Sequence, residues 1–281
     1  MKEPLSVEAI LAYALAEDIG SGDHTSLSTI SVDQKGSAQL LVKQEGVLSG
    51  MTIAKKIFSL VDSGLELTEY LHDGDKIRPG DIAFTVTGST LSILQAERLV
   101  LNFLQRMSGI ATTTSQYVSK VKGLNSKILD TRKTTPLLRT FEKEAVIHGG
   151  GYNHRFGLYD MILIKDNHVD FAGGINNAIF SAVQYLKDNK LDLQIEIEVR
   201  NFSELKQVLE NGQVHRIMLD NFAPDTLSQA IKMIGGRFET EASGGINMET
   251  IRSFAETGVD YISVGALTHQ IKSLDLSLKA C

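Results

Sequence analysis

The feature that most constrains the fold is a run of short apolar segments that alternate with helical segments from Ser126 onward. The apolar segments are KILDT, MILIK, LQIEIEV, RIMLD, FETEAS and DYISVG, and the helical ones lie near 136–148, 174–189, 203–211, 224–235 and 247–257. Repeated strand-then-helix units of this size predict parallel strands with right-handed crossovers. We therefore expect an α/β barrel, whose active site lies at the carboxyl ends of the strands.

The first part of the chain has a different pattern, which predicts an α+β region. A helix is expected from Ser6, with this serine as N-cap. Strand-like segments follow at 37–43, 46–50, 66–71 and 81–88, with a helix at 51–63 between them. A long helix, apolar on more than one side, is predicted from Ser89 to about Lys122.

Composition narrows the classes of partner. The 281 residues carry 34 Asp and Glu against 28 Lys and Arg, a formal net charge of -6, which argues against a nucleic-acid or membrane surface. The single cysteine, Cys281, excludes an intramolecular disulfide framework and a cysteine-based metal site. It suits a reducing compartment, and no apolar stretch approaches membrane-spanning length, so we expect the cytoplasm.

Polar residues and glycines follow almost every predicted strand of the second region. They are Arg132 and Lys133, Lys165 to His168, Glu198 and Arg200, Asp220 and Asn221, Ser243 to Gly245, and Gly265. One such residue alone is usually a solvated loop residue or a helix cap. In a barrel, however, all of these residues lie at one rim. The pattern therefore predicts a site there.

Two parts of this rim suit a phosphorylated, metal-bound ligand. The loops ASGGI (242–246) and SVGAL (263–267) offer backbone N–H groups that can hold a phosphate, and the last two strands of a barrel commonly do so together. Glu198 and Asp220 suit Mg²⁺, which prefers one or two carboxylates plus phosphate oxygens. Alternatively, these two carboxylates pair with the surrounding cations.

A third part of the rim is cationic. Its residues are Arg132, Lys133, His154, Arg155 and Lys165. Arginine matches planar carboxylates in bidentate fashion, and lysine adds a point charge. Because gathering cations in a cleft costs repulsion and desolvation, stability alone would not favour it. The cluster predicts a small, multiply charged anionic substrate.

Long motifs identify a resemblance to a known family. LDTRKTTPLLRTFEKEAV, GGGYNHRFGLYDMILIKDNH, EIEV, MLDNF, EASGGI and TGVDYISVGALTH are similar to motifs of the quinolinate phosphoribosyltransferase family, and AEDIGSGDHTS and LQAERLVLNFLQRMSGIAT extend the likeness into the first part of the chain. The resemblance implies an N-terminal α/β sandwich domain (1–111) and an open, seven-stranded α/β barrel of the type II phosphoribosyltransferases (112–267). The tail, 268–281, is expected to pack with the N-terminal domain.

The resemblance also implies roles for residues that match the motifs. The acceptor, quinolinate, would be bound by Thr131, Arg132, His154, Arg155 and Lys165, together with Arg98 from the other subunit of a homodimer. The donor, phosphoribosyl pyrophosphate, would contact Lys133, Ser243, Gly244, Gly245, Val264, Gly265 and Ala266. Glu198 and Asp220 would hold Mg²⁺ and the ribose hydroxyls, and with Lys133 they form the expected catalytic set. Leu137 departs from the pattern, because glycine often follows RKTTP.

The implied activity is transfer of a phosphoribosyl group to quinolinate with loss of CO2 in NAD biosynthesis. Two alternatives remain at this point. One is a related phosphoribosyltransferase with another acceptor, such as the paralogues found with molybdate transport. The other is a non-catalytic sensor of a phosphate ligand built on a barrel.

Overall fold

The computed structural model describes residues 5–281, and the first four residues, where the expected N-terminal domain would start, lie outside this range. The chain divides into two compact units. The first comprises residues up to Ser115, 134–150 and 270–281, and the second comprises 116–133 and 151–269. Residues 134–150, which the expected boundary assigns to the barrel, thus group with the first unit.

The first unit is α+β, as its sequence predicts. Its elements are α1 (Val7–Ile19), α2 (His24–Thr29), β1 (Lys35–Val42), β2 (Gly46–Val47), α3 (Met51–Val61), β3 (Glu66–Glu69), β4 (Lys76–Ile77), β5 (Ile82–Ser89), most of α4 (Thr90–Lys120), α5 (Arg139–His148) and β12 (Leu276–Ala280). The Ser6 side chain accepts a hydrogen bond from the N–H of Ala9, which confirms the predicted N-cap of α1. The long predicted helix is α4.

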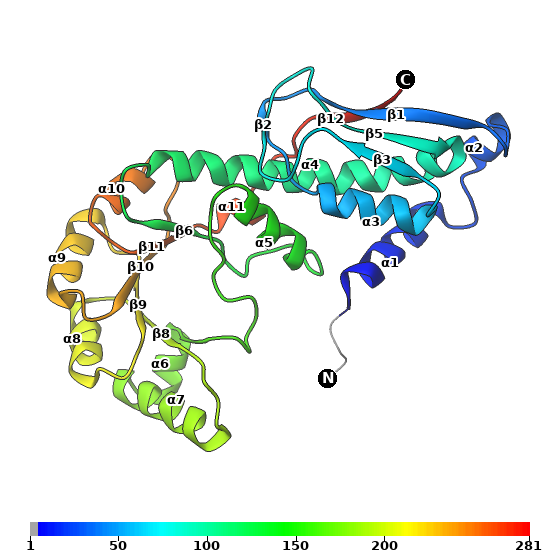
Figure 1. Ribbon diagram of the computed structural model, residues 1–281. Coiled ribbons are helices and arrows are strands. Elements are labelled where there is room, and N and C mark those ends of the chain that lie inside the picture. Colours follow the sequence, from blue (N-terminus) through cyan, green and yellow to red (C-terminus); the bar gives the residue numbers. More distant parts are fainter. Residues whose placement is uncertain (1–4) are drawn as a thin grey trace. The chain divides into compact units, whose positions relative to one another are not determined.

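An antiparallel sheet with the order β12-β1-β5-β3 forms the core of this unit (Figure 1). Alternate residues of β1, among them Leu40 and Val42, are buried, as expected for a strand with one covered face. Phe58 of α3 packs edge-on against Phe84 of β5, with ring centroids 5.8 Å apart. The last strand, β12, pairs with β1, so the end of the chain completes this sheet.

The second unit contains the predicted strand-and-helix repeats. Its elements are β6 (Lys127–Leu129), β7 (Ile162–Ile164), α6 (Asp166–Ala172), α7 (Ile175–Asn189), β8 (Ile195–Val199), α8 (Phe202–Asn211), β9 (Arg216–Asp220), α9 (Pro224–Ile234), β10 (Glu239–Ser243), α10 (Ile251–Ala255), β11 (Tyr261–Ser263) and α11 (Ala266–His269). All six strands are parallel, in the order β6-β11-β10-β9-β8-β7. Figure 1 shows α7 to α10 on the outer side of the curved row of strands.

The sheet has six strands where the family resemblance implies seven. In place of a seventh strand, Tyr152 forms an isolated parallel bridge to Leu129. The adjoining backbone N–H groups bond to side chains rather than to a neighbouring strand: those of Phe156 and Gly157 donate to Asp160. β6 and β7 are therefore the edges of an open sheet. Among residues 5–281, no helix has both the length and the apolar character needed to cross a membrane.

Leu137 has an unusual backbone conformation that explains why glycine is often found at this position. Its φ is +66°, in the left-handed region, and its side chain is 68% exposed. A side chain with a Cβ is strained there by about 1 kcal/mol, whereas glycine is not. The turn that leads into α5 therefore favours glycine, although leucine still permits the helix to begin at Arg139.

We predict that Leu137→Gly stabilises the first unit by about 0.5–1 kcal/mol, because it relieves the left-handed strain. Thermal unfolding followed by circular dichroism measures the change. Leu158→Gly is the matched control, since Leu158 is similarly exposed (71%) but has no positive φ. A lower melting temperature for Leu137→Gly than for the parent protein would contradict this explanation.

Candidate active site

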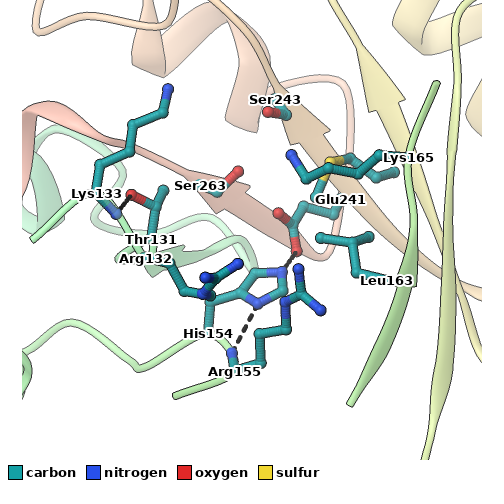
Figure 2. A pocket seen from close by; sticks show the side chains of 11 residues that line it. Thr131, Arg132, Lys133, His154, Arg155, Leu163, Lys165, Glu241, Ser243 and Ser263 are labelled. Atoms are coloured by element: carbon teal, nitrogen blue, oxygen red, sulfur yellow. Dashed lines mark hydrogen bonds and ion pairs between the residues drawn. The ribbon is translucent and has the colours of Figure 1, made fainter. Parts of the chain in front are cut away.

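A cavity of about 330 Å³ lies in the second unit at the carboxyl ends of its parallel strands (Figure 2). Its lining residues are Thr131, Arg132, Lys133, His154, Arg155, Leu163, Lys165, Met218, Glu241, Ser243 and Ser263. They come from five strands or the loops that follow them, and from the 151–160 segment. This convergence is what the barrel rule predicts from the sequence.

Four cationic side chains surround the cavity. Figure 2 shows those of Arg132, Arg155 and Lys165 around the same space, with Lys133 at its edge. Burial and the positive charge of Arg132 lower the pKa of Arg155, while the carboxylates of Glu196 and Asp160 act in the opposite direction. Two guanidinium groups thus lie close enough to repel one another. An anion bound between them would offset that repulsion.

The backbone of the loop after β6 is held at several points. The Lys133 N–H donates to Oγ1 of Thr131 (3.1 Å), and the Thr268 hydroxyl donates to the Lys133 carbonyl (2.8 Å). The Lys133 side chain passes over Gly265, where a Cβ would lie 3.2 Å from its Cδ. Lys133 therefore lies between the cationic cavity and the loop formed by residues 264–266.

The two predicted metal-binding carboxylates lie at the ends of neighbouring strands. Glu198 is on β8 and Asp220 ends β9. Burial, and then the charge of Asp220, raise the pKa of Glu198, whereas Lys165, 3.7 Å away, lowers it. The Asn221 side-chain amide donates to Asp220. Carboxylate oxygens are the ligands that Mg²⁺ prefers, so Glu198 and Asp220 could hold this ion.

His154 is placed at the cavity, but both of its ring nitrogens already have protein partners. The Arg155 backbone N–H donates to Nδ1 (2.7 Å), and Nε2 lies 3.2 Å from Glu196 and 3.3 Å from Glu241. Burial lowers the pKa of His154, but hydrogen bonds to these carboxylates and their charges outweigh it and raise the pKa to about 9.

The structure brings most of the predicted residues to one place. Thr131, Arg132, Lys133, His154, Arg155, Lys165 and Ser243 line the cavity. Glu198 contacts Lys165, Asp220 pairs with Ser243 in the sheet register, and Gly265 contacts Lys133, so these flank it. Gly244 and Gly245 follow Ser243, and Val264 and Ala266 flank Gly265. Arg98 is exposed on α4, in the first unit, whereas the cavity is formed by residues of the second unit.

Three cavity residues are absent from the sequence prediction, namely Leu163, Met218 and Glu241, whereas Ser263 begins the predicted loop 263–267. The polar residue of these three, Glu241, had a detectable signal. Glu241 is two residues before Ser243, as Glu196 is two before Glu198, and alternate residues of a strand point to the same side. Acidic residues at this spacing in buried strands predict polar side chains inside the barrel. Leu163 and Met218 have no such signal, because apolar residues are expected throughout these strands.

The glycine loop after β10 is fitted closely to the turn after β9. Asn221 has φ +57°, and its N–H donates to the Ser243 carbonyl (2.8 Å). At Gly244, which has φ +95°, a Cβ would lie 2.2 Å from Oδ1 of Asn221 and 2.9 Å from its backbone nitrogen. Only glycine fits there without moving the turn that carries Asp220.

The fold and this site together define an α/β protein with a cation-lined cavity that adjoins two carboxylates and two glycine loops. Family models agree: the quinolinate phosphoribosyl transferase N-terminal domain matches residues 23–108, and the corresponding C-terminal domain matches residues 110–279. The chain belongs to the quinolinate phosphoribosyltransferase family.

Individual proteins support this assignment over the whole chain. A Nicotiana tabacum protein named quinolinate phosphoribosyltransferase [decarboxylating] 2a, mitochondrial, is 45% identical and covers 97% of this chain and 82% of its own length. A Bacillus subtilis probable nicotinate-nucleotide pyrophosphorylase [carboxylating] is 43% identical, with coverages of 98% and 93%. The crystal structure of NadC from Streptococcus pyogenes superposes with a TM-score of 0.92 at 39% identity and covers 100% of this chain and 99% of its own.

We predict that Gly244→Ala destabilises the second unit by about 1–3 kcal/mol, because the added Cβ forces the Asn221 turn to move. Gly245→Ala is the control: Gly245 also has a positive φ (+61°) but has no other atom within 4 Å of a Cβ, so the substitution adds backbone strain alone. Thermal unfolding of both variants measures the difference. Equal losses would show that the contact with Asn221 is unimportant.

Proposed function

We propose that this chain transfers the phosphoribosyl group of phosphoribosyl pyrophosphate to quinolinate with loss of CO2, giving nicotinate mononucleotide and pyrophosphate for NAD biosynthesis. One observation carries the proposal. In a chain of this family, four cationic side chains line a single cavity, and that cavity adjoins a carboxylate pair and two glycine loops. A dianionic acceptor and a polyphosphate donor are the ligands that such a pair of neighbouring sites fits.

The cationic part of the cavity suits quinolinate. Arg132, Arg155 and Lys165 have the charge and the donor geometry to bind two adjacent carboxylates, and Thr131 adds a hydroxyl. Leu163 and Met218, both largely buried, offer apolar surface for the pyridine ring. The repulsion between Arg132 and Arg155 favours occupation by an anion over an empty cavity.

The neighbouring part of the rim suits the donor. Loops 243–245 and 264–266 would hold its 5′-phosphate through backbone N–H groups. Glu198 and Asp220 would hold Mg²⁺ and the ribose hydroxyls, and Lys133 would lie between donor and acceptor. When bound, Mg²⁺ supplies positive charge that stabilises the departing pyrophosphate.

In the first step, the pyridine nitrogen of quinolinate attacks the anomeric carbon of the ribose. The carbon–oxygen bond to pyrophosphate breaks, and its electron pair leaves with pyrophosphate. Lys133 and the neighbouring cations stabilise this developing negative charge. Holding the two reactants in line is the main task of the protein, because good orientation can lower the barrier by about 7–11 kcal/mol.

In the second step, the carbon–carbon bond to the 2-carboxylate breaks and CO2 leaves. The electron pair remains on the ring carbon next to the positively charged nitrogen, which offsets much of its charge, and a proton from solvent completes the product. No general base is needed. Arg132, Arg155 and Lys165 hold the ring through both steps, because the remaining carboxylate stays bound.

Under this proposal, the active site is completed by a residue from a second copy of the chain. Arg98 is exposed on α4, so its side chain is accessible, and under this proposal it reaches the acceptor site of the partner subunit in a homodimer. The exposed Cys281, the single cysteine of the sequence, supports a location in the reducing cytoplasm.

The direct test is to incubate the protein with quinolinate, phosphoribosyl pyrophosphate and Mg²⁺ and to measure the release of CO2. We expect equal amounts of CO2 and nicotinate mononucleotide, and chelation of Mg²⁺ should stop both. Nicotinate in place of quinolinate is the control for acceptor choice, because it lacks the 2-carboxylate. Turnover of another acceptor in preference to quinolinate, or binding without turnover, would reject the proposal.

Lys165→Ala should lower kcat/KM for quinolinate by about 100-fold, because a charge-assisted contact contributes about 1.5–3 kcal/mol. Its side chain is 48% exposed, so the melting temperature should change little. Lys187→Ala, which removes an exposed lysine on α7 of the same unit, is the matched control and should retain activity. Normal steady-state kinetics for Lys165→Ala would remove this lysine from the acceptor site.

A further inference from the structure

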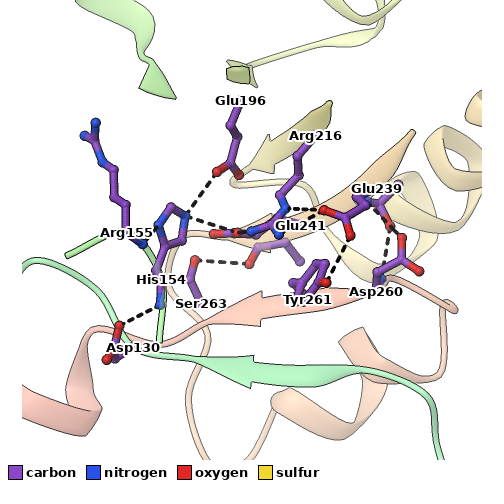
Figure 3. A network of polar contacts seen from close by, with 12 residues as sticks. Asp130, His154, Arg155, Glu196, Arg216, Glu239, Glu241, Asp260, Tyr261 and Ser263 are labelled. Atoms are coloured by element: carbon purple, nitrogen blue, oxygen red, sulfur yellow. Dashed lines mark hydrogen bonds and ion pairs between the residues drawn. The ribbon is translucent and has the colours of Figure 1, made fainter. Parts of the chain in front are cut away.

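A network of buried charged residues lies at the base of the cavity (Figure 3). Glu196 of β8 and Glu241 of β10 are both 0% exposed, and Arg216 of β9, between those two strands, is 9% exposed. Arg216 is 3.3 Å from Glu241 and 2.9 Å from Glu239. Glu196 and Glu241 both face Nε2 of His154, at 3.2 and 3.3 Å.

These contacts fix the segment that carries two cavity residues. Nε2 of the His154 ring lies between the carboxylates of two strands, and Nδ1 accepts the Arg155 backbone N–H. The His154 backbone N–H donates to the buried carboxylate of Asp130, at 2.9 Å. The backbone at 154–155 is therefore attached to the sheet from both sides, and Arg155 extends from this anchored point into the cavity (Figure 2).

Stability alone does not explain two buried glutamates here. The interior of an α/β barrel is usually filled by Val, Ile and Leu. Replacing buried ion pairs by apolar residues of similar size is often neutral or stabilising. Burial raises the pKa of Glu241, but the hydrogen bond and charge of His154 act the other way and the net shift is downward, so this cavity-lining carboxylate also places negative charge beside a proposed anion site. The clearest geometric consequence of the two glutamates is the fixed orientation of the His154 ring, and through it the position of Arg155.

We propose that Glu196 and Glu241 are positioning residues for the acceptor: they clamp the His154 ring and thereby hold the Arg155 guanidinium where it binds the dicarboxylate. This inference rests on the proposed function. It assigns His154 a role through Arg155 and its backbone, because both ring nitrogens have protein partners. Arg216, 3.3 Å from Glu241, offsets the charge of that carboxylate.

The test uses the full-length enzyme with Glu196→Leu, which removes the hydrogen-bond acceptor and keeps a side chain of similar size. We expect KM for quinolinate to rise about tenfold or more, because small displacements of binding groups have large effects. KM for phosphoribosyl pyrophosphate should not change. Glu196→Gln should be intermediate, because it removes the charge but keeps a polar side chain of the same shape beside Nε2. Calorimetric binding of quinolinate gives an independent measurement.

Glu239→Leu is the matched control. Glu239 is on β10 and binds Arg216 like Glu241, but the contacts shown in Figure 3 place it away from His154. It should leave KM for quinolinate unchanged. If the glutamates acted only through charge, removing one from beneath an anion site would lower KM for quinolinate.

An unchanged or lowered KM for quinolinate in Glu196→Leu would overturn the inference. An equal rise of the KM values for quinolinate and phosphoribosyl pyrophosphate in this variant would do the same. So would a rise of KM for quinolinate in Glu239→Leu as large as that in Glu196→Leu. If Glu196→Leu does not fold, Glu196→Gln is used instead, and an unchanged or lowered KM for quinolinate in that variant would overturn the inference. The proposed function fails separately: a wild-type protein that neither binds nor converts quinolinate rejects that function, and this inference with it. Wild-type activity combined with unaffected variants rejects the inference alone.

Discussion

The electrostatic repulsion among four cations around one cavity is the constraint on which the rest of the site depends. Arg132, Lys133, Arg155 and Lys165 come from three separated stretches of the second unit. Bringing them together without a ligand is unfavourable, so the surrounding structure has to hold them. The hydrogen bonds of the loop after β6 and the anchored backbone at 154–155 do this.

Much of the fold was predictable from the sequence because the residue patterns are local. The Ser6 N-cap, the long α4 and the six short parallel strands follow from apolar spacing and capping residues. The strand β12 and the short helix α6 were not foreseen. β12 depends on pairing with β1 more than 200 residues away, and α6 begins within a polar segment that reads as a loop.

Most residues of the candidate site could be predicted from the sequence, but the contacts between their side chains could not. The rule that strand ends converge at one rim placed Arg132, Lys165 and Glu198 in one region. No pattern in the sequence shows that His154 turns both ring nitrogens toward the protein, since that depends on Glu196 and Glu241 meeting from two different strands. Glu196 is also difficult to distinguish from Glu198, because both alternate along the same buried strand.

The contact between Lys165 and Glu198, at 3.7 Å, joins the two halves of the site through one side chain. Lys165 belongs to the proposed acceptor site and Glu198 to the proposed metal and donor site. A cation held by Glu198 would free the lysine to face the acceptor, and an acceptor that draws the lysine away would leave the carboxylate more available to a cation. Occupation of either half would then favour the other by the same coupling free energy, whichever ligand arrives first.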